Sequence, residues 1–308
     1  MLVELNHTST KRLQRKETLM GWLYVSPFII GIAVFTLVPF IISIVAMFYN
    51  WKPEQTIFEA TANGWQNFYN IFSSKGANTA DYWKTYANTL ILAIQLPVCL
   101  ILGILLALAM NRKMRGVQAF RVIYYLPGIM SVVAVTIVWQ KMFDEFGIIN
   151  TLLQKLNLKT VNWLHSKAGM YFTVNFLQVW KGVGYSTLMF IAGLQSVSTD
   201  QIEAARIDGA TERKVFTAIT LPALYPILFY LLITGLMGAL QMFNEPFIIL
   251  GGYGKDIENA GMTTVGFVYN QFGNGYLGTA SVGAWILAVF IFIITAFQMR
   301  LDKKMRGD

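Results

Sequence analysis

Six long apolar blocks are the feature that most restricts what this chain can fold into. They run roughly over Trp22–Tyr49, Tyr86–Met110, Val122–Phe143, Tyr171–Val197, Leu221–Leu250 and Ser281–Met299. A helix rises about 1.5 Å per residue, so about 20 apolar residues cross the ~30 Å hydrocarbon core of a membrane. Backbone amides inside lipid also need internal partners, which a helix supplies. The blocks therefore predict an all-α polytopic membrane protein with six transmembrane helices.

The composition agrees with this fold class and argues against a soluble protein. Hydrophobic residues make up 55% of the 308 residues and charged residues only 13%, whereas a soluble domain carries roughly 25% charged residues. The first block does not have the form of a cleavable signal peptide, because it is long, contains Pro27 and Pro39 and lacks a cleavage site of small residues. We therefore expect it to remain as the first span.

The distribution of Lys and Arg predicts the orientation of the spans. Fifteen of these residues lie in the two terminal segments and in the second and fourth connections, whereas eight are spread over the three other, longer connections. The positive-inside rule then makes both termini cytoplasmic, and an even number of spans agrees with that. The expected organisation is a cytoplasmic N-terminal tail, residues 1–21, followed by a transmembrane domain, residues 22–308.

Several function classes find no support in the sequence. The net charge of +8 comes without the concentrated basic face and interleaved aromatic residues of a nucleic-acid-binding protein. A single cysteine, Cys99, and the isolated His7 and His165 predict neither a disulfide framework nor a metal site. There is also no Gly-x-x-x-x-Gly-Lys-Ser/Thr stretch and no catalytic cluster. We expect a protein that is not an enzyme and binds no cofactor of its own.

The connection between the fourth and fifth spans, about residues 198–222, is more than a turn. Thr199 is expected to cap a helix that presents a face of small residues, and Gly209 is expected to end or bend that helix. A second helical stretch is predicted over Glu212–Ile219, and Leu221-Pro222 marks entry into the next span. A small-residue helix of this kind suits insertion into a groove of another protein; an ordinary amphipathic connector is the alternative.

Resemblance to a known family favours the first of these alternatives. The pattern Glu203-Ala204-Ala205, three residues, Gly209, nine residues, Ile219, one residue and Leu221-Pro222 resembles the EAA loop of binding-protein-dependent ABC importer permeases. The resemblance implies that the loop is a coupling helix seated in a cleft of an ATPase subunit. It implies that the coupling residues are Glu203, Ala204, Ala205, Asp208 and Gly209.

Further similarity, covering nearly the whole chain from Trp22, narrows the branch. The runs Leu177–Tyr185, Ile191–Ser196 and Phe243–Gly252 resemble carbohydrate-uptake permeases related to maltose permeases. The chain departs from that pattern at Gly251-Gly252-Tyr253-Gly254, and its loop before the second span is short. The resemblance implies a heterodimer with a second permease, two copies of a cytoplasmic ATPase that use ATP and Mg²⁺, and an extracellular solute-binding protein. It also implies a location in the bacterial cytoplasmic (plasma) membrane.

Polar residues recur on single faces of the predicted spans and give candidate substrate-path residues. Because such residues are costly in lipid, they usually face a bundle interior or a water-filled path. In the fourth and fifth spans these are Gln178, Lys181, Gly182, Tyr185, Gln241, Asn244 and Glu245, with Thr234 and Gly238 on the same face. Similar pairs are Asn88 and Gln95 in the second span, and Thr136 and Gln140 in the third. Hydrogen bonding between packed helices is the other interpretation, and Lys181 and Glu245 could pair with each other.

The function expected from these features is that of a permease subunit of an ATP-driven ABC importer for a sugar or oligosaccharide. One alternative is an importer of the same architecture for another solute, such as glycerol phosphate, although an anionic solute should need more than Lys181 in the path. A different class, the standalone secondary transporter, should show an internal repeat or membrane-embedded carboxylates for ion coupling. The sequence shows no convincing repeat, and Glu245 alone is thin support.

Overall fold

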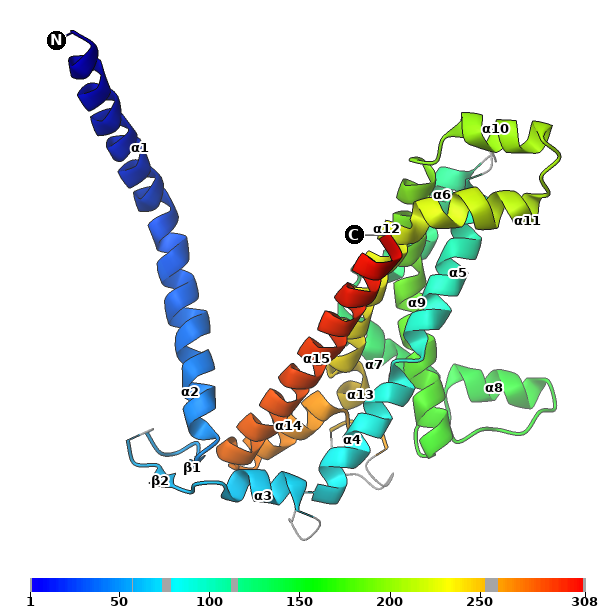
Figure 1. Cartoon of the computed structure of the whole chain (residues 1–308). Coiled ribbons are helices and arrows are strands. Elements are labelled where there is room, and N and C mark those ends of the chain that lie inside the picture. The colour runs from blue at the N-terminus through cyan, green and yellow to red at the C-terminus, as the bar shows by residue number, and fades with distance from the viewer. Residues whose placement is uncertain (1, 57, 74–78, 112–115, 253–259, 307–308) are drawn as a thin grey trace.

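Long helices joined by short helices and loops make up the protein (Figure 1). The computed structural model describes residues 2–56, 58–73, 79–111, 116–252 and 260–306. Lys75, Arg112, Lys113, Arg115, Tyr253, Gly254 and Lys255, on which parts of the charge count and the departure from the family pattern rest, lie outside these ranges. The α-helices are α1 (Leu2–Ile32), α2 (Val38–Ala46), α3 (Gln66–Phe72), α4 (Thr79–Leu92), α5 (Gln95–Met110), α6 (Val117–Ile129), α7 (Val132–Met142), α8 (Ile148–Lys155), α9 (Lys167–Leu194), α10 (Thr199–Ile207), α11 (Glu212–Val215), α12 (Leu221–Leu240), α13 (Asn244–Ile249), α14 (Thr264–Gly273) and α15 (Leu277–Arg306).

Two π-helical segments and one small sheet complete the fold. The π-helices cover Ala33–Leu37, between α1 and α2, and Phe216–Thr220, between α11 and α12. The strands β1 (Tyr49–Asn50) and β2 (Thr61–Ala62) form an antiparallel pair in which Tyr49 is opposite Ala62. The two π-helices join their neighbouring α-helices without a break, so each forms part of a longer helical rod.

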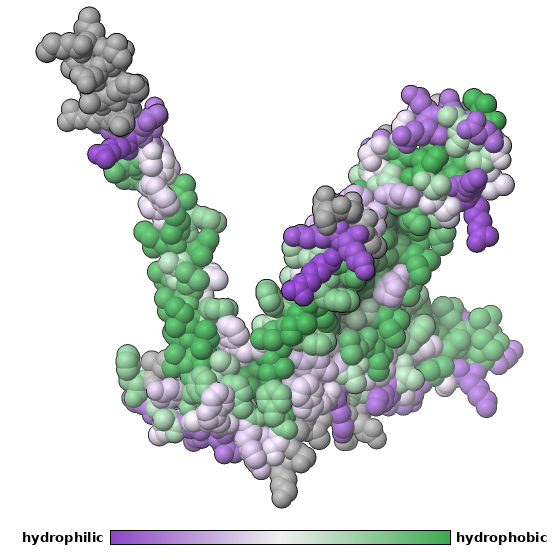
Figure 2. Space-filling model, in the orientation of Figure 1, coloured by the Kyte–Doolittle hydropathy of each residue, from purple (hydrophilic) through white to green (hydrophobic). Residues whose placement is uncertain are grey.

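The first rod, formed by α1, the π-helix and α2, stands apart from the other helices (Figure 1). Its apolar part is Gln14–Ala46, and none of its most apolar window is buried. It meets α15 near its C-terminal end, where the rings of Phe40 and Trp285 lie 4.7 Å apart and Trp285 Nε1 donates to Ser43 Oγ at 3.1 Å. The expected boundary between residues 21 and 22 falls inside α1. Figure 2 shows hydrophobic residues along most of this first rod, so its surface requires lipid or another membrane protein around it.

The apolar blocks correspond to helices, but the count of six spans is not confirmed. In the described part of the chain, four helices are long and apolar enough to cross a membrane: Gln14–Ala46, Tyr82–Met110, Glu212–Ile249 and Leu277–Lys304. The third block is a bent pair, Ala119–Ile129 and Val132–Met142, with an angle of 95°, and would make a fifth span. The fourth block is α9, which is long enough at 28 residues but carries polar residues along its length.

Two of the spans contain breaks that neighbouring helices close. Between α4 and α5, the backbone N of Gln95 donates to Asn175 Oδ1 of α9 at 3.1 Å, and Asn175 Nδ2 donates to the Ile91 carbonyl at 3.4 Å. In the fifth block, α12 ends at Leu240, and α13 follows after a short turn. Non-helical backbone at membrane depth is tolerated where protein covers it, and Asn175 of α9 supplies that cover between α4 and α5.

The centre of the bundle is α9, which contributes to both of its larger hydrophobic clusters. One cluster joins α9 to α7 and α13, and the other joins it to α5 and α12. Small residues allow close approach: a Cβ built on Gly103 of α5 would lie 2.7 Å from the Cβ of Ser186, and one built on Gly184 would lie 2.4 Å from the Tyr124 carbonyl of α6. These seams of small residues are typical of helix packing in membranes.

A buried polar network ties α4 to α9 and α14. Asn88 Nδ2 donates to the Met262 carbonyl at 2.9 Å, and Asn88 Oδ1 accepts a hydrogen bond from the Tyr171 hydroxyl. The Thr89 hydroxyl accepts from the backbone N of Thr264 at 3.1 Å. For Asn88, the structure therefore supports the interpretation of hydrogen bonding between packed helices.

Candidate functional site

The connection after the fourth block folds into a helix–turn–helix unit at one end of the molecule. Ser198 is the residue that caps α10, because its side chain accepts a hydrogen bond from the backbone N of Gln201 at 3.5 Å. The prediction that Thr199 is the cap is wrong by one residue: Thr199 is the first residue of α10. Thr211 caps α11 in the same way, accepting from the backbone N of Lys214 at 3.4 Å. Both hydroxyl caps satisfy amides that a helix start leaves free.

Gly209 ends α10, as the sequence predicts. Its φ of +79° lies in the left-handed region that a side chain disfavours. The backbone N of Gly209 donates to the Arg206 carbonyl at 3.0 Å, and the backbone N of Ala210 donates to the Ala205 carbonyl at 2.9 Å. This pair of bonds is a Schellman motif. The glycine therefore fixes the angle at which the chain leaves α10 and enters α11.

A salt bridge spans the turn and holds α10 against α11. Arg206 Nε donates to Glu212 Oε1 at 2.9 Å, and Arg206 Nη2 donates to Glu212 Oε2 at 3.2 Å. The hydrogen bond and the negative charge of Glu212 raise the pKa of Arg206 above its usual value. The fork geometry of this pair adds directional restraint to the turn.

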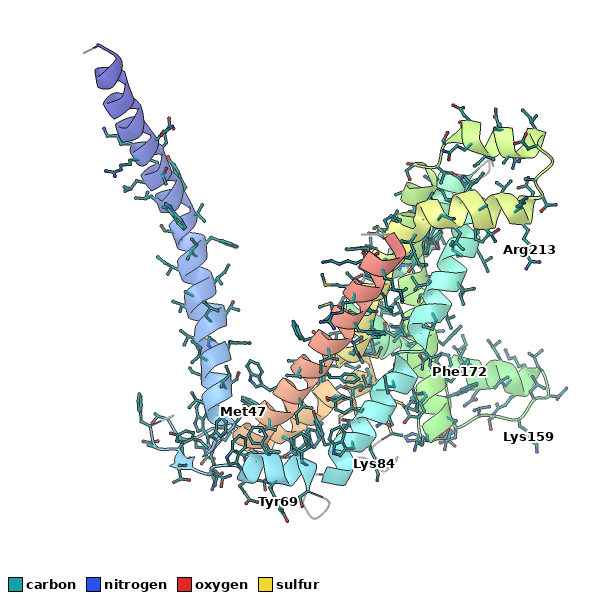
Figure 3. The ribbon with its side chains drawn as sticks, viewed as in Figure 1. Met47, Tyr69, Lys84, Lys159, Phe172 and Arg213 are labelled. Carbon is teal, nitrogen blue, oxygen red and sulfur yellow. The ribbon has the colours of Figure 1, made fainter. Side chains whose placement is uncertain are left out.

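The coupling residues expected from the family resemblance lie on the accessible surface of this unit. Glu203, Ala204, Asp208 and Gly209 are exposed, and Ala205 is half-buried. Ile207 is 86% exposed, an unusual position for a large apolar side chain. Val215 of α11 is buried, so the second helix anchors the unit while α10 faces outward. Figure 3 shows Arg213 projecting from the side of α11, downward in the view.

A buried ion pair joins α9 to the short helix α13. Lys181 Nζ lies 3.0 Å from Glu245 Oε1, and each side chain is only 10% exposed. The sequence leaves open whether these two residues pair with each other, and in the structure they do. Pairing offsets the cost of placing each charge in a region of low dielectric constant.

Gln140 of α7 closes the other end of α13. Its Nε2 donates to the carbonyls of Ile248 at 3.0 Å and Ile249 at 2.9 Å. These carbonyls belong to the last turn of α13 and would otherwise need water or another donor. The break in the fifth block is thus held by α9 on one side and by α7 on the other.

The remaining candidates for the substrate path do not meet at one point. Gln178 is half-buried on α9, whereas Gln241 and Asn244 are exposed around the break. A Cβ on Gly182 would lie 3.1 Å from Cys99 Sγ, which places this glycine in the seam between α5 and α9. The Tyr185 hydroxyl lies 3.5 Å from that of Tyr230, a residue that the stripes do not include although it lies four residues before Thr234.

An apolar cavity lies between α12, α14 and α15. Its volume is about 510 Å³, and its lining residues are Met237, Gln241, Val265, Val268, Ala284, Leu287, Ala288, Ile291, Phe292 and Thr295. Among the path candidates only Gln241 contributes to it. Within the described residues no group of three or more His, Cys, Asp or Glu side chains could hold a metal ion.

The sequence of this chain is similar to those of known transport proteins. The family model described as "Binding-protein-dependent transport system inner membrane component" matches residues 99–307. The chain is 31% identical over 285 residues to the probable ABC transporter permease protein YesP of Bacillus subtilis (strain 168), covering 91% of this chain and 89% of YesP. It is 28% identical to the lactose transport system permease protein LacF of Rhizobium radiobacter, covering 94% of this chain and 96% of LacF.

The fold is similar to that of a chain in a solved ABC transporter. A chain of a bacterial alginate ABC transporter, crystallised in complex with an alginate pentasaccharide-bound periplasmic protein, superposes with a TM-score of 0.80. The two chains are 24% identical, and the match covers 96% of this chain and 97% of the other. The arrangement of helices described above is therefore shared with a known membrane protein.

Proposed function

The chain belongs to the family of binding-protein-dependent transport system inner membrane components, and from this premise we propose that it is the sugar-translocating permease subunit of an ATP-driven importer. Members of this family are membrane-located components without catalytic function of their own. The observation that carries the proposal is the exposed α10–α11 unit, in which Glu203 to Gly209 present a rigid, capped helix to a partner.

The proposed partners follow from what the chain itself does not provide. A second permease subunit forms a heterodimer with it, and two copies of a cytoplasmic ATPase supply ATP hydrolysis with Mg²⁺. The solved alginate transporter is in complex with a periplasmic protein that carries an alginate pentasaccharide, which supports a solute-binding protein as a further partner here. In this proposal residues 22–308 form the transmembrane domain of the complex, residues 1–21 form a cytoplasmic tail, and both termini are cytoplasmic.

Energy transfer would proceed through α10. Closure of the ATPase dimer moves the α10–α11 unit as one body, because the Schellman turn and the Arg206–Glu212 bridge hold the two helices together. The π-helical segment joins this unit without a break to α12, so displacement of α10 is transmitted to the fifth span. The spans then change between two discrete arrangements, one open outward and one open inward.

A sugar is the substrate class that the relatives and the charges favour. LacF is named as a lactose permease, and amide groups such as those of Gln178, Gln241 and Asn244 offer donors and acceptors to hydroxyl groups. Glycerol phosphate is the alternative within the same architecture. Its phosphate would require cationic groups, and Lys181, the cation expected in the path, is already neutralised by Glu245.

The test is ATP-dependent sugar uptake by membrane vesicles that contain this chain and its candidate partners. Gly209→Ala forces a side chain into the left-handed region at a cost of about 1 to 2 kcal/mol, although its Cβ meets nothing within 4 Å. We expect Gly209→Ala and Glu203→Lys to lower uptake and ATPase association while the chain still reaches the membrane. The matched control is Gly273→Ala, which also has open space but no positive φ. Unchanged uptake in both loop variants, or uptake by the chain alone, would contradict the proposal.

A further inference from the structure

The segment between α7 and α9 forms a rigid side arm that the proposed transport function does not use. At its centre is Asn150, which is almost fully buried. Asn150 Oδ1 accepts hydrogen bonds from the backbone N of Val161 at 3.1 Å and from Trp163 Nε1 at 3.0 Å. Its Nδ2 donates to the carbonyls of Glu145 at 3.1 Å and Val161 at 3.0 Å. One amide therefore joins both ends of the arm into a defined structure.

The helix within this arm, α8, is also closed at its C-terminal end. Asn157 has a φ of +56°, the single non-glycine residue with positive φ among those described. Its backbone N donates to the Gln154 carbonyl at 3.0 Å, and the backbone N of Leu158 donates to the Leu153 carbonyl at 2.8 Å. These bonds form a Schellman motif with Asn in the position that otherwise favours Gly. The arm therefore presents its side chains in fixed directions.

Large apolar side chains cover the outside of this rigid arm. The exposed ones are Phe146 (90%), Ile148 (56%), Leu152 (50%), Leu156 (68%), Leu158 (56%) and Val161 (38%). Soluble surfaces rarely gather so many apolar side chains in one place. An apolar surface of this kind is typical of a site that contacts lipid or another protein.

The position and charge of the arm indicate what covers it. Figure 1 shows α8 extending sideways from the start of α9, across the direction of the spans. In Figure 2 the arm is hydrophobic over most of the drawn face and hydrophilic along its lower edge, away from the spans. Figure 3 places Lys159 on that edge, and Lys155 ends α8. Such a division, apolar toward the bilayer and cationic toward water, is typical of a helix that lies in a membrane interface.

The arm also continues the apolar surface of the bundle. Phe172, on the first turns of α9 at the base of the arm, is 50% exposed, and its ring lies 5.4 Å from that of Trp163. Tryptophan and other aromatic residues gather at the headgroup level of membranes. The aromatic base of the arm and its apolar stripe are therefore parts of one lipid-facing surface.

From these observations we propose that α8 is an interfacial helix. Its apolar stripe lies in the headgroup–acyl boundary of the leaflet next to the start of α9, and Lys155 at its end and Lys159 in the loop that follows face anionic phospholipid headgroups. The arm would hold the bent α6–α7 pair and α9 at a fixed depth in the bilayer. A solute-binding protein would dock at an end of the bundle, whereas α8 projects from its side. Lipid is thus the occupant that the geometry favours.

The test measures the surroundings of two arm positions in the assembled importer, reconstituted in bilayers of phosphatidylethanolamine and phosphatidylglycerol. Cys99 is replaced by Ala, and single cysteines are introduced as Leu152→Cys and, as the matched control on the hydrophilic edge, Lys159→Cys. Each is labelled with an environment-sensitive fluorophore. We expect emission from position 152 to shift to shorter wavelength and to be quenched by spin-labelled lipid. The label at position 159 should instead be quenched by aqueous iodide.

Equal iodide quenching at both positions, with no lipid quenching at position 152, would overturn the proposal. A second outcome would also overturn the proposal. The label at position 152 could be insensitive to the lipid quencher and change its emission when solute-binding protein is added. Position 152 would then contact protein and not lipid. Leu156→Cys provides a second apolar position in case the Leu152 variant fails to assemble, and the same outcomes apply to it. The measurement needs no transport, so its result is independent of the uptake assay.

Discussion

At the scale of single residues, polar side chains inside this protein mostly serve the backbone. Asn175 satisfies the break between α4 and α5, Gln140 satisfies the last carbonyls of α13, and Asn88 holds the loop before α14. Each amide therefore supplies donors or acceptors to backbone groups near a point where a helix begins or stops. A stripe of polar residues in the sequence can therefore indicate an interruption of a helix as well as a path for a solute.

The Arg206–Glu212 bridge gives a prediction at this scale. Glu212→Gln removes the charge while keeping a similar shape, and we expect it to weaken ATPase association modestly because the α10–α11 unit loses a restraint. Arg206→Ala should have a similar effect, and the double variant should be no worse than either single one. The measurement is a double-mutant cycle on ATPase binding. Fully additive losses would show that the two side chains act separately.

The pH dependence of the bridge follows from the raised pKa of Arg206. A group whose pKa is raised on folding contributes stability at every pH below its unfolded value, and that contribution is lost as pH rises through the folded value. The pKa of an arginine lies far above neutral pH even in the unfolded chain, and Glu212 raises it further, so Arg206 stays charged throughout the neutral range. We therefore expect the coupling energy in the cycle above to be insensitive to mildly alkaline pH.

At the scale of elements, the ion pair between α9 and α13 determines how the interrupted fifth block is held. Breaking a buried pair by changing one partner costs about 3 to 5 kcal/mol, whereas replacing both partners with apolar residues is often neutral. We expect Lys181→Met or Glu245→Gln alone to lower the thermal stability of the solubilised complex. The double variant Lys181→Met with Glu245→Met should recover most of it.

The same variants distinguish a structural pair from a solute-binding one. If the pair only joins helices, the double variant transports with a KM close to that of the wild type. A double variant that is as stable as the wild type but has a strongly raised KM would assign these side chains to the substrate path.

The seam between α5 and α9 gives a second prediction for elements. Gly103→Ala places a Cβ 2.7 Å from the Cβ of Ser186, and because neither atom lies at the end of a flexible side chain, the helices must move apart. Overpacking of this kind costs about 1 to 3 kcal/mol. We expect lower thermal stability for Gly103→Ala and partial recovery when Ser186→Gly is added. If Ser186→Gly gives no recovery, the loss of stability does not arise from the contact between the two Cβ atoms.

At the scale of the whole molecule, the sequence predicts the helical class and the approximate place of each block, because hydrophobic length is a strong local signal. Gly209 could be predicted as a helix end because only its backbone conformation matters there. The bend between α6 and α7 follows Pro127 and Gly128. The length of the block alone predicts one continuous helix and does not indicate this bend. The Gln140 contact to α13 joins residues more than 100 positions apart, and no local pattern carries such information.

Figure 1 shows the N-terminus and the α10–α11 unit at one end of the molecule and β1, β2 and α3 at the other. The Lys and Arg distribution predicts that the termini and the loop of residues 198–222 lie on the same side of the membrane. The side arm begins near the opposite end, where α9 starts. One labelling experiment can therefore test the orientation of the entire chain.

In intact cells that produce a Cys99→Ala background, we expect a membrane-impermeant thiol reagent to label Lys159→Cys, since the proposed orientation places that position outside. Arg213→Cys, on the exposed surface of α11, should be labelled only after the cells are permeabilised and peripheral proteins are stripped from the membrane. The reverse pattern would invert the orientation and place the α10–α11 unit beyond the reach of a cytoplasmic ATPase. Labelling of both positions in intact cells would mean that α9 does not cross the membrane. The number of spans would then be odd, which disagrees with the placement of both termini on one side by the Lys and Arg distribution.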